Sequence, residues 1–216
     1  SGKTTTLLRR INHMLEVGIP PEKILMITFT KAAAQEMSVK FKKKFGEPNG
    51  ITFSTIHALC LKILMTYGGL SAENIIKTSD QWKFLLETAR KCQSVCDPAK
   101  AAGNFQMLYS AAMNNRMSPS EVNPKDIKGI SRKDFLFMSD EYRRMKERTG
   151  YIDFDDMLVK AYELMTGNPQ VLRQLRERWD YIQVDEYQDV NYLQRDLVYL
   201  LAGEKKNLCV AGDDDQ

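Results

Sequence analysis

The sequence predicts an α/β fold, in which a parallel sheet flanked by helices is interrupted by an all-helical insertion. Near both ends of the 216-residue chain, short apolar runs alternate with segments of helical periodicity. This alternation is typical of a parallel sheet covered by helices. Between about residues 70 and 150 no convincing strand occurs, and the apolar spacing is helical.

The first part begins with a helix predicted over residues 3–16, where Leu, Ile and Met recur at helical spacing. The run ILMITF (24–29) is continuously apolar, as expected of a strand buried on both faces. A helix (31–45), a short strand (50–54) and a further helix (55–68) complete this part.

The insertion contains three predicted helices, at 80–92, 99–113 and 132–148. Strand and helix then alternate again, with predicted helices at 153–165, 171–179 and 190–203 and predicted strands at 181–184 and 207–211. We therefore expect an α/β domain in two parts (1–69 and 151–216) with a helical subdomain (70–150) between them.

Composition and charge narrow the function classes. The chain is 43% hydrophobic and 27% charged, as in ordinary globular proteins, and its apolar runs are too short to span a bilayer. No signal peptide precedes the first motif, so we expect a cytoplasmic fragment that lacks residues at both ends. Residues 77–148 hold 14 Lys/Arg against 9 Asp/Glu, or +5, within a chain of net +3. This basic segment suits either a polyanion partner or a solvated helical surface.

Two further patterns are best explained without a functional site. Cys92 and Cys96 are four residues apart, which predicts one helix face, but neither His nor a further Cys lies nearby to complete a metal site. We expect reduced thiols. Lys40, Lys42, Lys43 and Lys44 stand at the end of a predicted helix, where cations are favourable on dipole grounds, and we interpret them as solvated surface.

The opening SGKTTTLL matches the second half of a phosphate-binding loop. In such a loop backbone amides cradle phosphate oxygens, a lysine (here Lys3) reaches the outer phosphates, and a hydroxyl (here Thr4) holds Mg²⁺. A helix follows at once and places its positive end at the anion. Ser1, Gly2 and Thr5 complete the expected nucleotide-contacting residues.

Carboxylates follow both later strands. Asp185 and Glu186 come directly after YIQV, at the strand end where ligands bind in open α/β sheets. One could hold Mg²⁺ while the other takes a proton from water. NLCVA is followed by three repelling aspartates and by Gln216, whose amide could orient water at a γ-phosphate. Alone, each stretch would be a polar surface loop; together they predict that Lys3, Asp185–Glu186 and Gln216 meet around one metal-bound triphosphate.

These segments resemble the UvrD-like (UvrD/Rep/PcrA) superfamily 1 DNA helicases. The segments SGKTTTL, ILMITFTKAAAQEM, TFSTIHALCLKIL, YIDFDDML, YIQVDEYQDVNYLQ and LCVAGDDDQ occur in the order of that family. The resemblance covers the chain apart from its helical middle, and VDEYQD with GDDDQ is a highly specific combination. It implies a RecA-like P-loop NTPase domain, the first of two that grip ATP between them. The implied activity is a DNA-stimulated ATPase motor, a 3′–5′ helicase on single-stranded DNA in repair or replication.

The resemblance also implies residue roles. Lys3 would bind the outer phosphates, Thr4 and Asp185 would hold Mg²⁺, and Glu186 would be the general base. Gln216 would sense the γ-phosphate, and Gln188 would link the nucleotide state to DNA. The implied contacts with single-stranded DNA are Phe29, Thr30, Lys31, Thr55, His57 and Phe154.

Some alternatives stay open. TFTKA departs from the family's usual Thr-Phe-Thr-Asn-Lys, so the phosphate contact of Lys31 is in question, and Phe29 taken alone would simply end a core strand. Without the second domain's arginines we expect this segment to bind nucleotide weakly and hydrolyse it poorly. Rival functions are the motor subunit of an ATP-dependent nuclease, a non-hydrolysing nucleic-acid-binding scaffold, and a small-molecule P-loop kinase.

Overall fold

The structure is a computed structural model that describes residues 2–47, 49–123 and 129–213. It consists of two compact units, one formed by Ser1–Tyr67 with Ala161–Gln216 and the other by Gly68–Lys160. The helix α7 (Phe154–Gly167) begins in the second unit and continues into the first. None of the described helices is long and apolar enough to cross a bilayer.

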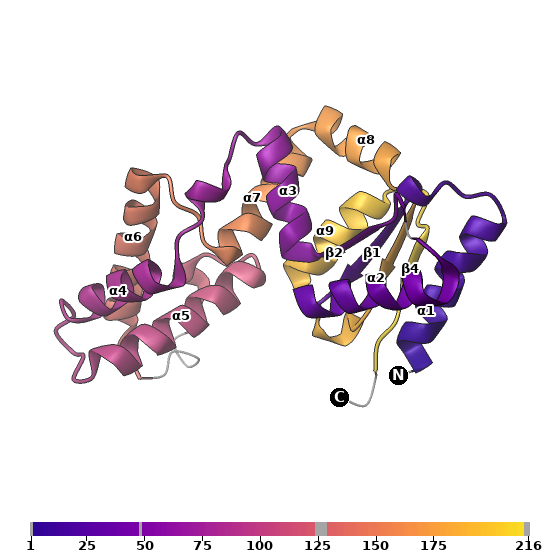
Figure 1. Cartoon of the computed structure of the whole chain (residues 1–216). Helices are drawn as coiled ribbons and strands as arrows, with labels where there is room; N and C mark the ends of the chain where they lie inside the picture. Colours follow the sequence, from indigo (N-terminus) through magenta and orange to yellow (C-terminus); the bar gives the residue numbers. More distant parts are fainter. Residues whose placement is uncertain (1, 48, 124–128, 214–216) are drawn as a thin grey trace. The chain divides into compact units, whose positions relative to one another are not determined.

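The first unit contains a four-stranded parallel sheet, so the predicted α/β fold is confirmed (Figure 1). Its strands are β1 (Ile24–Thr28), β2 (Thr52–Thr55), β3 (Tyr181–Val184) and β4 (Leu208–Val210), in the spatial order β2-β1-β3-β4. Every residue of β1 is buried, which explains its continuous apolar sequence. Because the strands are parallel, their carboxyl ends share one edge of the sheet, with Thr28 paired to Thr55 and Val184 to Val210.

Helices cover both faces of this sheet. On one face α1 (Gly2–Glu16) and α2 (Lys31–Phe45) share a core with β1 in which Ile11, Met26 and Phe41 are buried. Ile27 points to the opposite face, where it lies with Val184 beside Val198 of α9 (Tyr192–Ala202). This unit also contains α3 (Ile56–Tyr67), α8 (Pro169–Arg178) and the last part of α7.

The second unit is helical. Its helices α4 (Thr78–Ala89), α5 (Pro98–Asn114) and α6 (Arg132–Thr149) surround a core in which Leu85, Phe105 and Phe135 are fully buried. In the described part of this unit the only β pairing is an isolated bridge between Ile75 and Ile152. Short 3₁₀ turns in the chain are η1 (Pro21–Lys23), η2 (Ala72–Asn74), η3 (Pro119–Glu121) and η4 (Tyr187–Asp189).

Local capping sets the helix boundaries in the second unit. Asp97 accepts hydrogen bonds from Ala99 N and Lys100 N, so α5 begins at Pro98. Ser131 caps α6 in the same way, and Gly150 ends that helix with φ +70°, a conformation that favours glycine. The second compact unit continues past this helix end, to Lys160.

The predicted helix over 80–92 ends earlier than its periodicity indicates. After Ala89 the chain tightens, and Lys91 N and Cys92 N donate to Thr88 O and Ala89 O. The prediction that Cys92 and Cys96 share a helix face is therefore wrong. Cys92 is buried, which raises the pKa of its thiol to about 11. Within the described ranges no group of three or more His, Cys, Asp or Glu side chains is placed to hold a metal ion.

Candidate functional site

Three segments that are distant in sequence meet at the carboxyl edge of the sheet in the first unit: the start of α1 and the turns after β3 and β4. Thr4 Oγ1 donates to Asp185 Oδ2 over 3.3 Å. Lys3 Nζ lies 3.8 Å from Glu186 Oε2 and 3.3 Å from Asp213 Oδ2. The structure thus brings Lys3 and Thr4 to Asp185 and Glu186, whereas the predicted residues Ser1 and Gln216 lie outside the described residues.

The turn after β3 fixes its two carboxylates differently. Asp185 N donates to Ile27 O, which extends the sheet ladder, and Asp185 is only 6% exposed. Glu186 has φ 52° and ψ 47°, a left-handed conformation that is costly for a non-glycine residue and is often found at functional sites. Asp185 Oδ1 accepts from Glu186 N over 3.1 Å and supports this turn. As a result one carboxylate is held inside the edge while the next is turned toward solvent.

Gln188 ties the two turns together. Its Nε2 donates to Glu186 Oε2 over 2.6 Å, and its Oε1 accepts from Asp213 N over 3.0 Å. A Cβ on Gly212 would lie 3.0 Å from that Oε1 and 3.3 Å from Gln188 N, so a side chain there would push Gln188 aside by a few tenths of an ångström. A shift of the turn after β3 would therefore move the turn after β4, and the reverse also holds.

The charges at this edge suit an ammonium and a divalent cation. Asp213 belongs to the acidic run whose self-repulsion calls for a nearby cation, and Lys3 supplies that cation. The oxygen donors of Thr4 and Asp185 are the kind that Mg²⁺ prefers, usually with waters and ligand phosphates completing its shell. The residues present fit a magnesium-bound phosphate group at the start of α1.

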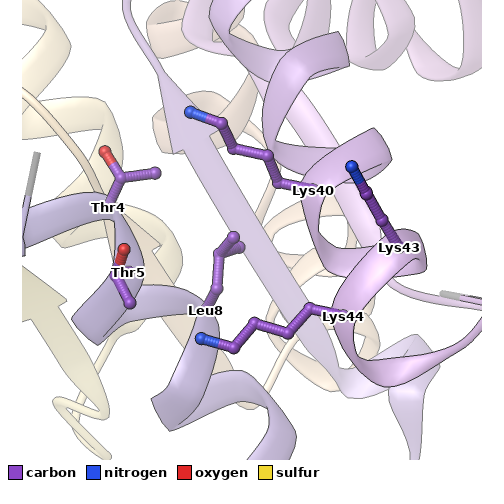
Figure 2. A pocket seen from close by; sticks show the side chains of 6 residues that line it. All are labelled: Thr4, Thr5, Leu8, Lys40, Lys43 and Lys44. Atoms are coloured by element: carbon purple, nitrogen blue, oxygen red, sulfur yellow. The ribbon is translucent and has the colours of Figure 1, made fainter.

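A pocket of about 360 Å³ adjoins this edge between α1 and α2 (Figure 2). It is lined by Thr4, Thr5, Leu8, Lys40, Lys43 and Lys44. The side chains of Lys40 and Lys44 extend toward α1 (Figure 2), although Lys40 also pairs with Glu36. The lysines are exposed, as a solvated surface would be, but they also concentrate positive charge beside Thr4. Their spacing of three and four residues, which puts them on one helix face, is the sequence signal for this pocket.

The first of the two motifs that are expected to face DNA lies at the end of β1. The strand ends at Thr28, and Phe29 is 53% exposed, so it does not end a core strand as the alternative interpretation holds. Thr30 caps α2, because its hydroxyl accepts from Ala33 N over 3.1 Å. Lys31 is exposed as the first residue of that helix.

The second motif lies at the end of the neighbouring strand β2, since Thr28 and Thr55 are register partners. The Thr55 hydroxyl accepts from Ala58 N over 3.1 Å at the start of α3. His57 is half-buried there, and burial lowers its pKa, which favours the neutral ring. Phe154, the remaining predicted DNA contact, is 56% exposed at the start of α7.

Comparison with known proteins gives the family. The UvrD/REP helicase N-terminal domain matches residues 1–216. The chain belongs to this family. It is 34% identical over 225 residues to YjcD of Bacillus subtilis, with all of this chain and 29% of YjcD covered. It is 33% identical over 222 residues to the ATP-dependent DNA helicase PcrA of Staphylococcus aureus, and likewise to that of Staphylococcus epidermidis, with all of this chain and 30% of each relative covered.

Sequence reasoning missed two features of this UvrD/REP domain. It did not assign Asp213 to Lys3, because an ion pair between the two ends of the chain leaves no local pattern. It also did not foresee the hydrogen bonds by which Gln188 joins the two turns. The chain spans about 30% of the length of the PcrA proteins it matches.

Proposed function

We propose that this chain is the ATP-binding domain of a DNA-stimulated ATPase motor that translocates on single-stranded DNA as a 3′–5′ helicase in repair or replication. The observation that carries the proposal is the meeting of Lys3 and Thr4 with Asp185 and Glu186 at one sheet edge. The PcrA relatives, which bear the name ATP-dependent DNA helicase, support the same activity. A second RecA-like domain in the same protein is the partner that would close over this edge.

Each residue has a distinct role in this proposal. Lys3 binds the outer phosphates through its ammonium, and the backbone of Ser1, Gly2 and Thr5 contributes at the positive end of α1. Thr4 and Asp185 hold Mg²⁺, which would neutralise phosphate charge when bound. Glu186 accepts a proton from the attacking water, and its solvent-facing carboxylate leaves room for that water. Gln216 senses the γ-phosphate, although it lies outside the described residues.

The pocket lined by Lys40, Lys43 and Lys44 can hold the base and sugar of the nucleotide. Thr4 and Thr5 at the start of α1 line one side of it, so a nucleoside attached to phosphates at this helix start would lie beside it (Figure 2). Leu8 offers it an apolar surface, and the ammonium groups of Lys40 and Lys44 can lie over the base or neutralise the α-phosphate.

Single-stranded DNA would lie along the ends of β1 and β2. The exposed ring of Phe29 stacks on a base, and such stacking contributes about 1–3 kcal/mol per base. Thr30, Lys31, Thr55 and His57 contact the backbone nearby, and Phe154 is a separate proposed DNA contact within the second unit. Thr28 and Phe29 at the end of β1 line the same small cavity as Asp185. The proposed DNA contact and the proposed nucleotide site are therefore close neighbours within this unit.

The deciding experiment measures ATP hydrolysis by the full-length protein with and without single-stranded DNA. We expect a strong increase with DNA and, on tailed duplexes, unwinding only from a 3′ tail. A hydrolysis rate that ignores DNA would remove the motor and favour a small-molecule kinase. Unwinding from a 5′ tail would reverse the proposed polarity, and vigorous turnover by residues 1–216 alone would contradict the need for a second domain.

A further inference from the structure

A small cavity in the first unit lies between the end of β1, the end of β3, the start of α3 and α9. Its volume is about 10 Å³, at the lower limit of the space that one water molecule needs. The walls of the cavity are therefore close to one another. A displacement of one wall has little empty space to absorb it, and the opposite wall must follow.

The cavity separates the proposed DNA contact from the turn that carries the proposed nucleotide carboxylates. Phe29 lines it at the end of β1 and is also 53% exposed, so part of this side chain is available to a base while another part faces the cavity. Asp185 lines it at the end of β3, directly before Glu186. A movement of Phe29 on DNA binding would reach the turn after β3 through these walls.

Most of the side chains that face the cavity are apolar. Ile27 and Val184 point to the face of the sheet on which α9 lies. Thr28 and Asp185, which follow them, point to the other face, where the Asp185 carboxylate accepts from Thr4 Oγ1. Thr28 and Asp185 therefore contribute their main chain to the wall of the cavity.

Gln194 of α9 is the remaining polar residue in the described part of the wall. It is 5% exposed, and a buried amide costs free energy unless its polar atoms are used. Its Oε1 accepts from Asn191 N over 3.3 Å and its main-chain N donates to Asn191 Oδ1 over 2.9 Å, which forms the capping box of α9. The cap fixes the amide to the helix start and does not use the two N–H donors of Nε2.

We propose that Gln194 is a positioning residue that couples single-stranded DNA at Phe29 to the proposed metal ligand Asp185. The proposal rests on the proposed function of the chain. A base stacked on Phe29 presses the end of β1 toward α9. Gln194 is anchored by its cap, and its Nε2 group meets the main chain of the two strand ends, so it transmits the displacement to the turn after β3.

The alternative is that Gln194 only caps α9. Capping by itself does not require burial, because Glu121 occupies the equivalent position of another capping box and is exposed. A purely capping side chain would contribute to stability alone. Any variant that breaks the same capping box would then have the same effect as a substitution of Gln194.

The test measures binding of oligo(dT) to the full-length protein by fluorescence anisotropy, with and without a non-hydrolysable ATP analogue and Mg²⁺. The ratio of the two affinities is the coupling between the sites, typically about 5- to 150-fold in coupled proteins. Gln194→Met removes the amide at nearly constant volume, and we expect it to bring this ratio close to one. DNA stimulation of the ATPase rate should fall by about tenfold.

Asn191→Ala is the matched control, because it breaks the same capping box and keeps the Gln194 amide. It should lower the urea midpoint and keep the wild-type coupling ratio. Gln194→Glu keeps the cap, since capping boxes accept Glu as well as Gln at this position, but it removes the N–H donors and should lose the coupling. In a Phe29→Ala background, Gln194→Met should not reduce DNA stimulation further, because both side chains act in one chain of contacts.

A wild-type coupling ratio in Gln194→Met and Gln194→Glu would overturn the role of Gln194 and leave the motor function standing. An equal loss of coupling in Asn191→Ala would assign the effect to the helix cap and also end the proposal. If the wild-type protein shows neither DNA stimulation nor any effect of the nucleotide on DNA affinity, the proposed function fails as well.

Discussion

Each unit contains a cluster of one lysine and two carboxylates, and the two clusters differ in burial. In the first unit Lys3 lies 3.8 and 3.3 Å from its partners, and the three side chains are 29–49% exposed. In the second unit Lys146 lies 3.0 Å from Asp153 and 2.7 Å from Asp156, with side chains 4–13% exposed. The buried cluster completes its hydrogen bonds within the protein, whereas the sheet-edge cluster leaves its charges accessible to a ligand.

We expect the largest effect from a substitution in the exposed cluster, measured as the ATPase rate. Replacing Glu186 by Gln removes the proposed base and keeps the shape of the side chain. General-base catalysis contributes typically 10²–10⁴-fold, so we expect the DNA-stimulated ATPase rate of the full-length protein to fall by about that factor. The urea midpoint should hardly change, because this side chain is 42% exposed.

The matched control is Glu204→Gln, which alters an exposed glutamate away from the sheet edge. It should leave the ATPase rate at the wild-type value. If Glu186→Gln hydrolyses ATP as fast as this control, the assignment of the base is wrong.

We expect the second-largest effect from a substitution in the buried cluster, measured as stability against urea. Burial opposes the charge of Lys146, yet Asp153 and Asp156 raise its pKa overall, so the ammonium is held in the charged form. Lys146→Met would leave two carboxylates buried without a cation, and breaking such a pair costs about 3–5 kcal/mol. We expect a large fall in the urea midpoint of the helical unit.

Arg144→Met serves as the comparison, because its ion pairs with Asp140 and Glu141 lie on the exposed side of α6. Exposed pairs add little stability, so its urea midpoint should stay close to that of the wild type. Equal losses in the two variants would mean that burial does not distinguish the clusters.

The sequence predicted the parts of the molecule that local pattern controls. The strands at 24–28 and 181–184 are continuous apolar runs, and Asp185 and Glu186 follow directly after one of them, so their place at the sheet edge could be foreseen. The pairing of Lys3 with Asp213 depends on how the two ends of the chain pack, and that of Lys146 with Asp153, seven residues apart, depends on how the chain turns at Gly150. No short-range periodicity records such packing, and for the same reason the end of α4 at Ala89 was misplaced.

A smaller effect is expected on the affinity for single-stranded DNA. Phe29→Ala removes the exposed ring at the end of β1. Loss of one base stack, about 1–3 kcal/mol, should weaken binding of single-stranded DNA by about fivefold or more in an anisotropy titration. Val39→Ala, which removes a side chain of similar exposure from α2, should not weaken it. Equal affinities of the two variants would show that Phe29 contacts no base.

The smallest effect concerns His57, which is intermediate between the two clusters in burial. Burial lowers its pKa in the folded state, so as pH falls through about 6.5 the unfolded chain takes up a proton that the folded chain does not. The free energy of unfolding therefore keeps its full value above this pH and decreases as the pH falls below it. We expect the wild type to lose more stability than His57→Gln between about pH 7 and pH 5, in urea titrations at each pH. His13, the other histidine of the chain, is exposed on α1, and His13→Gln should follow the wild type. If His57→Gln keeps the wild-type slope, carboxylates account for the acid sensitivity, and His57 would be free to carry a charge when it meets a DNA phosphate.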